Sequence, residues 1–413
     1  MSSAPRKGIP PLASLCSLED ATRIGYTVDE NVRRLLRYHW IEKRLAEIVT
    51  DRLAGTPEWE VKGAFALHQW LDCEHADALR NRIREMRQPM PRTDVPPEPE
   101  LESRLATLAD APTTHELLMG LLVFHRDLLD DYRHHYGRTN PLVDHPTRRV
   151  LRIIMIEEEE ILAWYEAAVA ARPAGKQQPG FAPQRDERFK ESYNFNFPPH
   201  NVKPLHYVSA QERNLALLCK RLLEMDVPEM MASFITERTD QPWDFQREYR
   251  RQLWDEARHS MMGEVAFEAR GIDWTKIPLN VGFSLRLNLY ATPEERQLLL
   301  YAIEQSLMPG DTGKRYEHEV AKQAGDELSA HFHDYDWADE VLHAQIGRRW
   351  LKPKGEETLE EAQRVHEKTW AALEQYSALQ PQREWWNDFV KEVLGRESEA
   401  RPEDLVEVKV LAE

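Results

Sequence analysis

Apolar residues recur every three or four positions along most of this chain. The segments with this period are 28–53, 59–86, 114–136 and 145–171 in the first half, and about 208–237, 243–270, 291–308 and 328–351 in the second. Side chains three and four positions apart share one face of an α-helix, so each segment predicts an amphipathic helix. No convincing run alternates apolar and polar residues as a half-buried strand does. The sequence therefore predicts an all-α fold.

Interruptions of the helical period divide the chain into four parts. Residues 173–205 contain six prolines and have no helical period, which predicts a linker between two domains. The two predicted domains, residues 20–172 and 206–351, each contain four helices. Residues 352–413 are strongly charged and predict a helical C-terminal tail.

The composition limits the classes of partner. The chain has 413 residues and a formal net charge of −17, which disfavours nucleic acid and anionic membranes as partners. It contains no run of about eighteen apolar residues, so no membrane-spanning helix is predicted. The N-terminal stretch lacks the apolar core of a secretion signal, and the three cysteines lack a CxxC spacing. We therefore expect reduced thiols and a cytoplasmic location.

One short motif occurs twice in the second half. Residues 255–259 read Asp-Glu-Ala-Arg-His, and residues 339–343 read Asp-Glu-Val-Leu-His. The Glu and His of each motif are three positions apart, so they share one face of a helix. Two such helices facing each other, with one further Glu from each of two other helices, provide the ligands of a carboxylate-bridged dinuclear metal site. Four buried carboxylates would be costly without cations, and two divalent ions would balance their charge.

The residue types also indicate the kind of metal and how its ligands are oriented. Oxygen and imidazole ligands without thiolates favour iron or manganese over zinc. A metal-bound imidazole usually donates its second N–H to a carboxylate, which fixes the orientation of the ring. Asp255 and Asp339, which precede the two glutamates, are placed to accept such a bond from the histidine of the opposite helix.

These motifs resemble a known superfamily. The stretches "DEARHSMMGEVAFEARGIDW", "KQAGDELSAHF" and "DEVLHAQIGRRW" make residues 205–351 similar to the ferritin-like di-iron carboxylate proteins, and more narrowly to a poorly characterised bacterial branch of them. The resemblance implies a ferritin-like four-helix bundle. The metal ligands that it implies, which would also be the catalytic residues, are Glu224, Glu256, His259, Glu304, Glu340 and His343.

The ligand from the first helix of this bundle is the least certain of the six. Pro228 lies four residues after Glu224 and cannot donate a hydrogen bond to its carbonyl, so we expect a kink there. Glu229 and Glu212 are therefore alternatives to Glu224.

The first half repeats the spacing of acidic residues. A shift of 182 residues places Glu42 on Glu224 and Glu74 on Glu256, and small changes in loop length pair Glu116 with Glu304 and Glu157 with Glu340. Asp77 and Glu160 then stand where the two histidines are expected. We therefore predict a second, degenerate ferritin-like bundle, although six carboxylates could still bind a hard cation. The histidines of this half that we expect on helix surfaces or caps are His39, His68, His115, His125, His134 and His135.

The resemblance also implies an activity. It predicts an O₂-dependent non-haem di-iron oxidase or oxygenase that acts on a small organic substrate, with two iron ions as cofactors and O₂ as co-substrate. An Mn/Fe or Mn/Mn pair suits the same ligands. An external electron donor and a homodimer formed through helix faces are compatible with this activity. Two other classes stay open: an iron-handling ferroxidase or peroxide-scavenging protein, and a non-catalytic helical scaffold stabilised by its metal.

Overall fold

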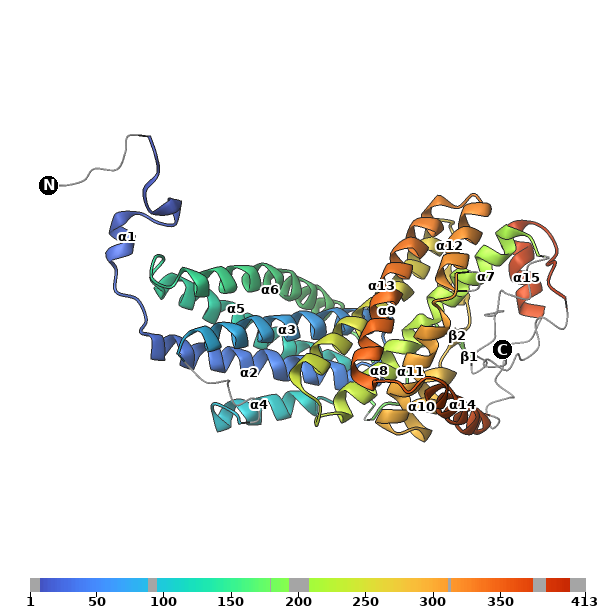
Figure 1. The fold of residues 1–413 in the computed structure, drawn as a ribbon, viewed down its shortest axis with the longest axis horizontal. Helices are drawn as coiled ribbons and strands as arrows, with labels where there is room; N and C mark the ends of the chain where they lie inside the picture. The colour runs from blue at the N-terminus through green and yellow to red at the C-terminus, as the bar shows by residue number, and fades with distance from the viewer. Residues whose placement is uncertain are drawn as a thin grey trace. The chain divides into compact units, whose positions relative to one another are not determined.

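The predicted fold class agrees with the structure. The computed structural model describes residues 8–87, 95–178, 180–192, 208–310, 313–373 and 384–401. Regular structure in these ranges is almost entirely helical, so the protein is all-α (Figure 1). Two short strands, β1 (Glu191–Ser192) and β2 (Leu279–Asn280), pair in parallel. Each helix in these ranges is too short or too polar to cross a bilayer.

The chain divides into two compact units. The first unit comprises residues 1–49 and 68–177, and the second comprises residues 50–67 and 178–413. Residues 50–67 contain the end of one long helix and the beginning of the next, so the division passes through both helices.

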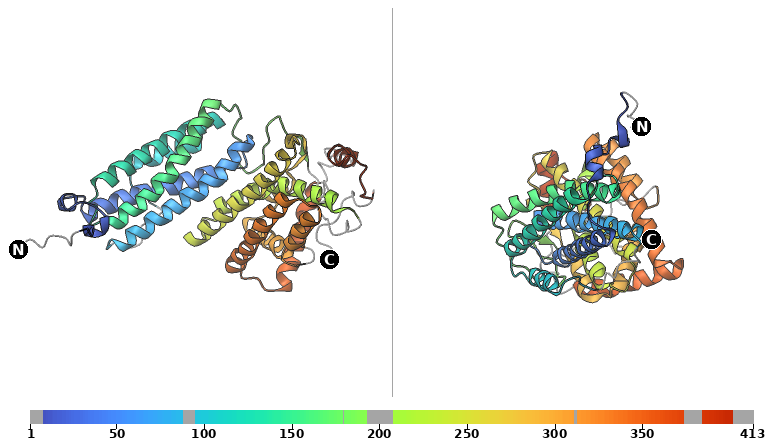
Figure 2. Two further views of the ribbon diagram at one scale, coloured as in Figure 1. Left: turned by 90° about the horizontal axis from the view of Figure 1, so that it is seen from above. Right: turned by 90° about the vertical axis from the view of Figure 1, so that its left-hand side faces the viewer.

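Four long helices run side by side in the first unit (Figures 1 and 2). They are α2 (Val28–Arg52), α3 (Trp59–Glu85), α5 (Thr114–Arg138) and α6 (His145–Ala171), and the shorter elements are η1 (Pro11–Ser14), α1 (Leu18–Thr22) and α4 (Pro99–Ala109). The hydroxyl of Thr113 accepts a hydrogen bond from the backbone of Glu116, and the carboxylate of Asp144 accepts one from Thr147, which caps α5 and α6.

The second unit contains more and shorter helices. They are α7 (Ala210–Leu222), η3 (Leu223–Met225), α8 (Asp226–Glu237), α9 (Trp243–Glu268), η4 (Trp274–Lys276), α10 (Gly282–Tyr290), α11 (Pro293–Ser306), α12 (Lys314–Gln323), α13 (Glu327–Leu351), α14 (Glu356–Ala371) and α15 (Glu384–Leu394). Helix α9 packs against α7, α8 and α13, and α13 also packs against α11 and α12. The tail helices α14 and α15 pack against α11 and α7, respectively.

The first helical segment of the second unit is interrupted where the sequence predicted a kink. A 3₁₀ turn, η3, separates α7 from α8 and contains Glu224. Pro228 has no N–H to donate to the carbonyl of Glu224, which explains why the α-helix does not continue through this point. The predicted kink is therefore confirmed.

A close approach between helices fixes the position of this turn. An added Cβ at Gly263 of α9 would lie 2.7 Å from the backbone nitrogen of Leu222 and 2.8 Å from its Cα. One turn earlier, the hydroxyl of Ser260 donates a 2.8 Å hydrogen bond to the carbonyl of Leu222. The end of α7 therefore lies directly against α9, two residues before Glu224.

The replacement Gly263→Ala should destabilise the second unit. The added methyl group meets backbone rather than a flexible side chain, so we expect the free energy of unfolding to fall by about 1–3 kcal/mol. The control Gly137→Ala adds the same group in α5, where nothing lies within 4 Å of the added Cβ. It should raise the free energy of unfolding by up to about 1 kcal/mol through helix propensity. Urea unfolding followed by circular dichroism measures both, and equal effects would contradict the close approach.

Candidate metal centre

The structure brings the six predicted ligands together in the second unit. Ligand atoms of Glu256, Glu304, Glu340 and His343 all lie within 4.8 Å of one another. A second group, whose ligand atoms also all lie within 4.8 Å of one another, contains Glu224, His259 and Asp336. The sequence did not predict Asp336. We call these seven residues together the second-unit centre. Six of them are at most 3% exposed, and the side chain of Glu224 is 12% exposed.

Two of the carboxylates lie between the two imidazoles. Oε1 of Glu256 is 3.1 Å from Nδ1 of His343, and its Oε2 is 3.7 Å from Nδ1 of His259. Oε2 of Glu340 is 3.4 Å from Nδ1 of His343, and its Oε1 is 3.9 Å from Nδ1 of His259. Each carboxylate therefore directs one oxygen toward each imidazole. Bridging carboxylates in a dinuclear site have this arrangement, with one oxygen available to each of two cations.

The two aspartates orient the imidazoles across the helix pair. Nε2 of His343 on α13 lies 3.4 Å from Oδ2 of Asp255 on α9, and Nε2 of His259 on α9 lies 3.1 Å from Oδ2 of Asp339 on α13. Arg258 contacts both aspartates, at 2.6 and 2.8 Å. Donation of the Nε2 proton to an aspartate leaves the Nδ1 lone pair of each ring facing the centre. Neither Nδ1 has a hydrogen-bond partner among the described residues.

Two buried cations that the sequence analysis did not identify contact the centre. Nζ of Lys314, the first residue of α12, lies 2.8 Å from Oε1 of Glu340 and 2.9 Å from Oδ1 of Asp336. The guanidinium of Arg221 contacts Asp336 at 2.6 and 2.7 Å and Glu317 at 3.1 Å. Both side chains are at most 2% exposed. In the sequence, Lys314 closes the stretch "MPGDTGK", which resembles an incomplete phosphate loop, so nothing local indicated its role.

The charges at the centre do not balance. Five carboxylates belong to the two groups, and Lys314 and Arg221 provide two permanent positive charges. Three negative charges therefore remain when all five carboxylates are ionised and both imidazoles are neutral, which is the state of these groups as metal ligands. Burial and the neighbouring Glu340 raise the pKa of Glu304 well above its usual value. Burial also opposes ionisation of Glu340, but Lys314 holds its pKa well below the usual value. The remaining negative charge is what bound divalent cations would compensate.

The two alternatives to Glu224 lie elsewhere. Glu229 forms an ion pair with Lys62 and a bidentate ion pair with Arg185. It belongs to neither group of ligand atoms of the second-unit centre. Glu212 accepts a hydrogen bond from Trp386 of α15 at 3.3 Å and also contacts Arg396. The 3₁₀ turn therefore presents Glu224, and not Glu229, to the centre.

The acidic cluster of the first unit differs from the predicted one. The group of ligand atoms consists of Glu42, Asp72, His75 and Glu158. Of the six predicted carboxylates it therefore contains only Glu42, and it lacks Glu74, Asp77, Glu116, Glu157 and Glu160. A shift of 184 residues rather than 182 aligns Asp72 with Glu256 and His75 with His259. The expectation that this cluster lacks an imidazole is therefore wrong. The signal that could have revealed it was Asp72-x-x-His75, which has the same spacing as the Glu-x-x-His pairs.

The predicted surface position of the first-half histidines is also wrong for most of them. His39, His68, His125 and His135 are at most 3% exposed. An isolated histidine in a helical segment carries no sequence signal of its burial, because its neighbours decide whether the ring lies inside.

Comparison of the sequence with models of known protein families finds no match, and comparison with curated protein sequences likewise finds none.

The replacement Lys314→Met should destabilise the second unit when metal is withheld by a chelator. It leaves the carboxylates of Asp336 and Glu340 buried without their ammonium partner, and we expect a loss of about 3–5 kcal/mol in the free energy of unfolding. Urea unfolding in the presence of the chelator measures this loss.

The control Lys322→Met removes the same charge from the same helix. Lys322 is 55% exposed and pairs only with Glu319 among the contacts found, so its replacement should change stability by no more than about 0.5 kcal/mol. Similar effects of the two replacements would show that Lys314 does not compensate buried charge.

Proposed function

We propose that the second unit is a ferritin-like bundle that binds two divalent metal ions, preferably iron. With these ions it would catalyse an O₂-dependent oxidation of a small organic molecule. The ligands would be Glu224, Glu256, His259, Glu304, Glu340 and His343, joined by Asp336. The observation that carries this proposal is the pair of carboxylates, Glu256 and Glu340, that direct one oxygen toward each of two oppositely placed imidazoles.

The donor atoms fit iron or manganese. Carboxylate oxygens and imidazole nitrogens form the centre, and no cysteine belongs to either group of ligand atoms found in the described residues. Such donors suit Fe and Mn, and an Mn/Fe or Mn/Mn pair is compatible with the same set. A reduced iron pair, when bound, supplies the electrons with which O₂ is activated, and an external donor would restore them.

The protein's own residues would prepare the centre for this reaction. Asp255 and Asp339 fix the ring orientation of the two histidines, which sets the Nδ1 atoms toward the ligating carboxylates. Burial excludes water from the carboxylates and strengthens their electrostatic interactions. Lys314 keeps a proton on Nζ beside Oε1 of Glu340 and keeps this carboxylate ionised.

A second candidate function follows from the position of Lys314. Its ammonium contacts Asp336 and lies 3.7 Å from Oε1 of Glu224. It also lies 2.8 Å from Oε1 of Glu340, which is the oxygen that faces His259 and not His343, so Lys314 is on the His259 side of the centre. This favours, as the alternative, a single ion bound by Glu256, Glu304, Glu340 and His343, which would stabilise a non-catalytic scaffold. The number of ions lost on mutation separates the two.

Replacement of a shared ligand should remove the metal of the second unit. We expect Glu256→Ala and His343→Ala each to lower the iron content by two atoms per chain, measured by elemental analysis after anaerobic loading with Fe²⁺. The matched controls are Glu268→Ala on α9 and His331→Ala on α13, whose side chains are exposed. A loss of one atom would support the single-ion alternative, and iron contents equal to the controls would exclude a metal centre here.

The oxidase proposal also predicts reactivity toward O₂. Protein loaded with Fe²⁺ without oxygen should show a rapid optical change on mixing with O₂ in a stopped-flow instrument. This phase should be missing in His343→Ala and retained in His331→Ala. Two bound iron atoms that do not react with O₂ would contradict the oxidase and leave a structural metal site.

A further inference from the structure

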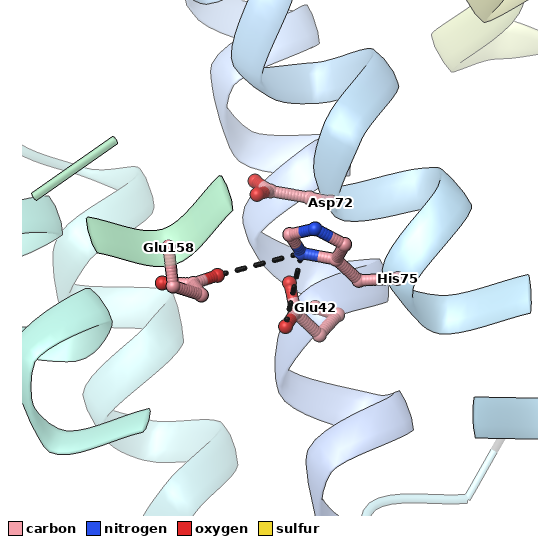
Figure 3. A group of neighbouring side chains, drawn as sticks. All are labelled: Glu42, Asp72, His75 and Glu158. Atoms are coloured by element: carbon pink, nitrogen blue, oxygen red, sulfur yellow. Dashed lines mark ion pairs between the residues drawn. The ribbon is translucent and has the colours of Figure 1, made fainter. Parts of the chain in front are cut away.

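A second group of metal-ligand side chains lies in the first unit. Glu42 on α2, Asp72 and His75 on α3, and Glu158 on α6 each offer a ligand atom within 4.8 Å of the other three (Figure 3). We call these four residues the first-unit cluster. All four are at most 2% exposed, so water does not satisfy them freely.

Several atoms of this cluster have no partner. Both carboxylate oxygens of Asp72, Oε2 of Glu42, Oε1 of Glu158 and Nδ1 of His75 form no hydrogen bond with the described residues. Buried polar atoms almost always have such a partner, and each one left without it destabilises the fold. Five unsatisfied atoms in four neighbouring side chains therefore indicate a missing ligand rather than isolated defects.

The imidazole of His75 has its hydrogen-bond partner outside the cluster. Nε2 of His75 lies 2.8 Å from Oε2 of Glu157, so donation of its proton there leaves the Nδ1 lone pair facing Glu42 at 3.4 Å and Glu158 at 3.5 Å. This is the usual orientation of a histidine ligand by a carboxylate.

Two further side chains contact the carboxylates. Nδ1 of His125 lies 3.0 Å from Oε2 of Glu158, whose Oε1 faces His75. The hydroxyl of Tyr132 donates to Oε1 of Glu42, which also faces His75, and Oε2 of Glu42 is left without a partner.

No lysine or arginine of the described residues forms an ion pair with the carboxylates of the cluster. Three carboxylates lie together, and within the described ranges their ion pairs are formed with His75 and His125 only. The second-unit centre differs, since Lys314 and Arg221 are part of its surroundings. The three carboxylates of the first-unit cluster therefore depend on the neighbouring imidazoles or on a bound cation for compensation of their charge.

We propose that the first unit binds one divalent cation of the Mn²⁺ or Fe²⁺ type through Glu42, Asp72, His75 and Glu158. Three carboxylates and one imidazole form a predominantly oxygen donor set that suits these ions. Asp72 supplies two of the five ligand atoms that have no partner. The site is independent of the metal and the reaction proposed for the second unit.

The test measures Mn²⁺ binding by the loss of the electron paramagnetic resonance signal of the free ion, in full-length protein. The background is His343→Ala, which removes a ligand of the second-unit centre. In this background we compare Glu158→Gln with the matched control Glu160→Gln, since Glu160 lies on the same helix with an exposed side chain. We expect one bound Mn²⁺ per chain in the background and in the control, and none with Glu158→Gln.

Two further variants make the result specific. Asp72→Asn keeps the shape of the side chain and should also abolish the bound Mn²⁺, which covers the case that Glu158→Gln fails to fold, as judged by circular dichroism. Glu157→Gln changes a positioning residue only, so it should weaken binding by about 10- to 100-fold without abolishing it. Absence of bound Mn²⁺ in the background, or equal binding by Glu158→Gln and Glu160→Gln, would overturn the proposal.

The experiment also separates this proposal from the one for the second unit. Should the second-unit centre bind no metal, His343→Ala would bind as much Mn²⁺ as the unmodified chain, yet Asp72→Asn would still remove one ion. Should the first-unit cluster bind none, Asp72→Asn would leave the Mn²⁺ content unchanged in both proteins.

Discussion

The compensation of buried negative charge is the constraint on which both units depend. The first-unit cluster places three carboxylates in the protein interior, and the second-unit centre places five. An uncompensated buried carboxylate is costly enough to be protonated or to destabilise the fold. In the second unit, Lys314 and Arg221 provide part of the compensation and also connect α12 and α7 to α13. In the first unit no lysine or arginine of the described residues pairs with the cluster. The imidazoles of His75 and His125 are instead the groups that pair with its carboxylates.

Both clusters follow one rule of construction. The outer nitrogen of each ligand-type histidine faces a carboxylate of a neighbouring helix, Asp255, Asp339 or Glu157, and the inner Nδ1 is left open. This rule links packing to chemistry, because the outer partners come from neighbouring helices. The crossed pairs Asp255–His343 and Asp339–His259 require α9 and α13 to face each other at one level. The same contacts that align the two helices therefore also direct both Nδ1 atoms toward Glu256 and Glu340.

The sequence predicted the parts of the structure that depend on local spacing. The helical period gave the fold class, Pro228 predicted the interruption beside Glu224, and the repeated Asp-Glu-x-x-His motif identified residues that the structure brings together. Residues that reach a centre through tertiary packing were not predictable. Lys314 belongs to a separate helix, α12, and Asp336 lies in α13 outside the motif.

The first-unit cluster was missed for a different reason. Its Asp72 has a shorter side chain than the glutamate at the corresponding position and lies two residues out of the assumed register, so a comparison anchored on glutamates passed over it. The neighbouring imidazole of His125 belongs to no motif, and its contact with Glu158 follows only from the packing of α5 on α6.

The most direct test of the central claim is the anomalous X-ray scattering of crystals of the iron-loaded protein, measured on both sides of the iron absorption edge. The account predicts two iron peaks in the second unit, flanked by Glu256 and Glu340, one on the side of His343 and one on the side of His259. Crystals loaded with iron in which no anomalous peak lies between these residues would contradict it.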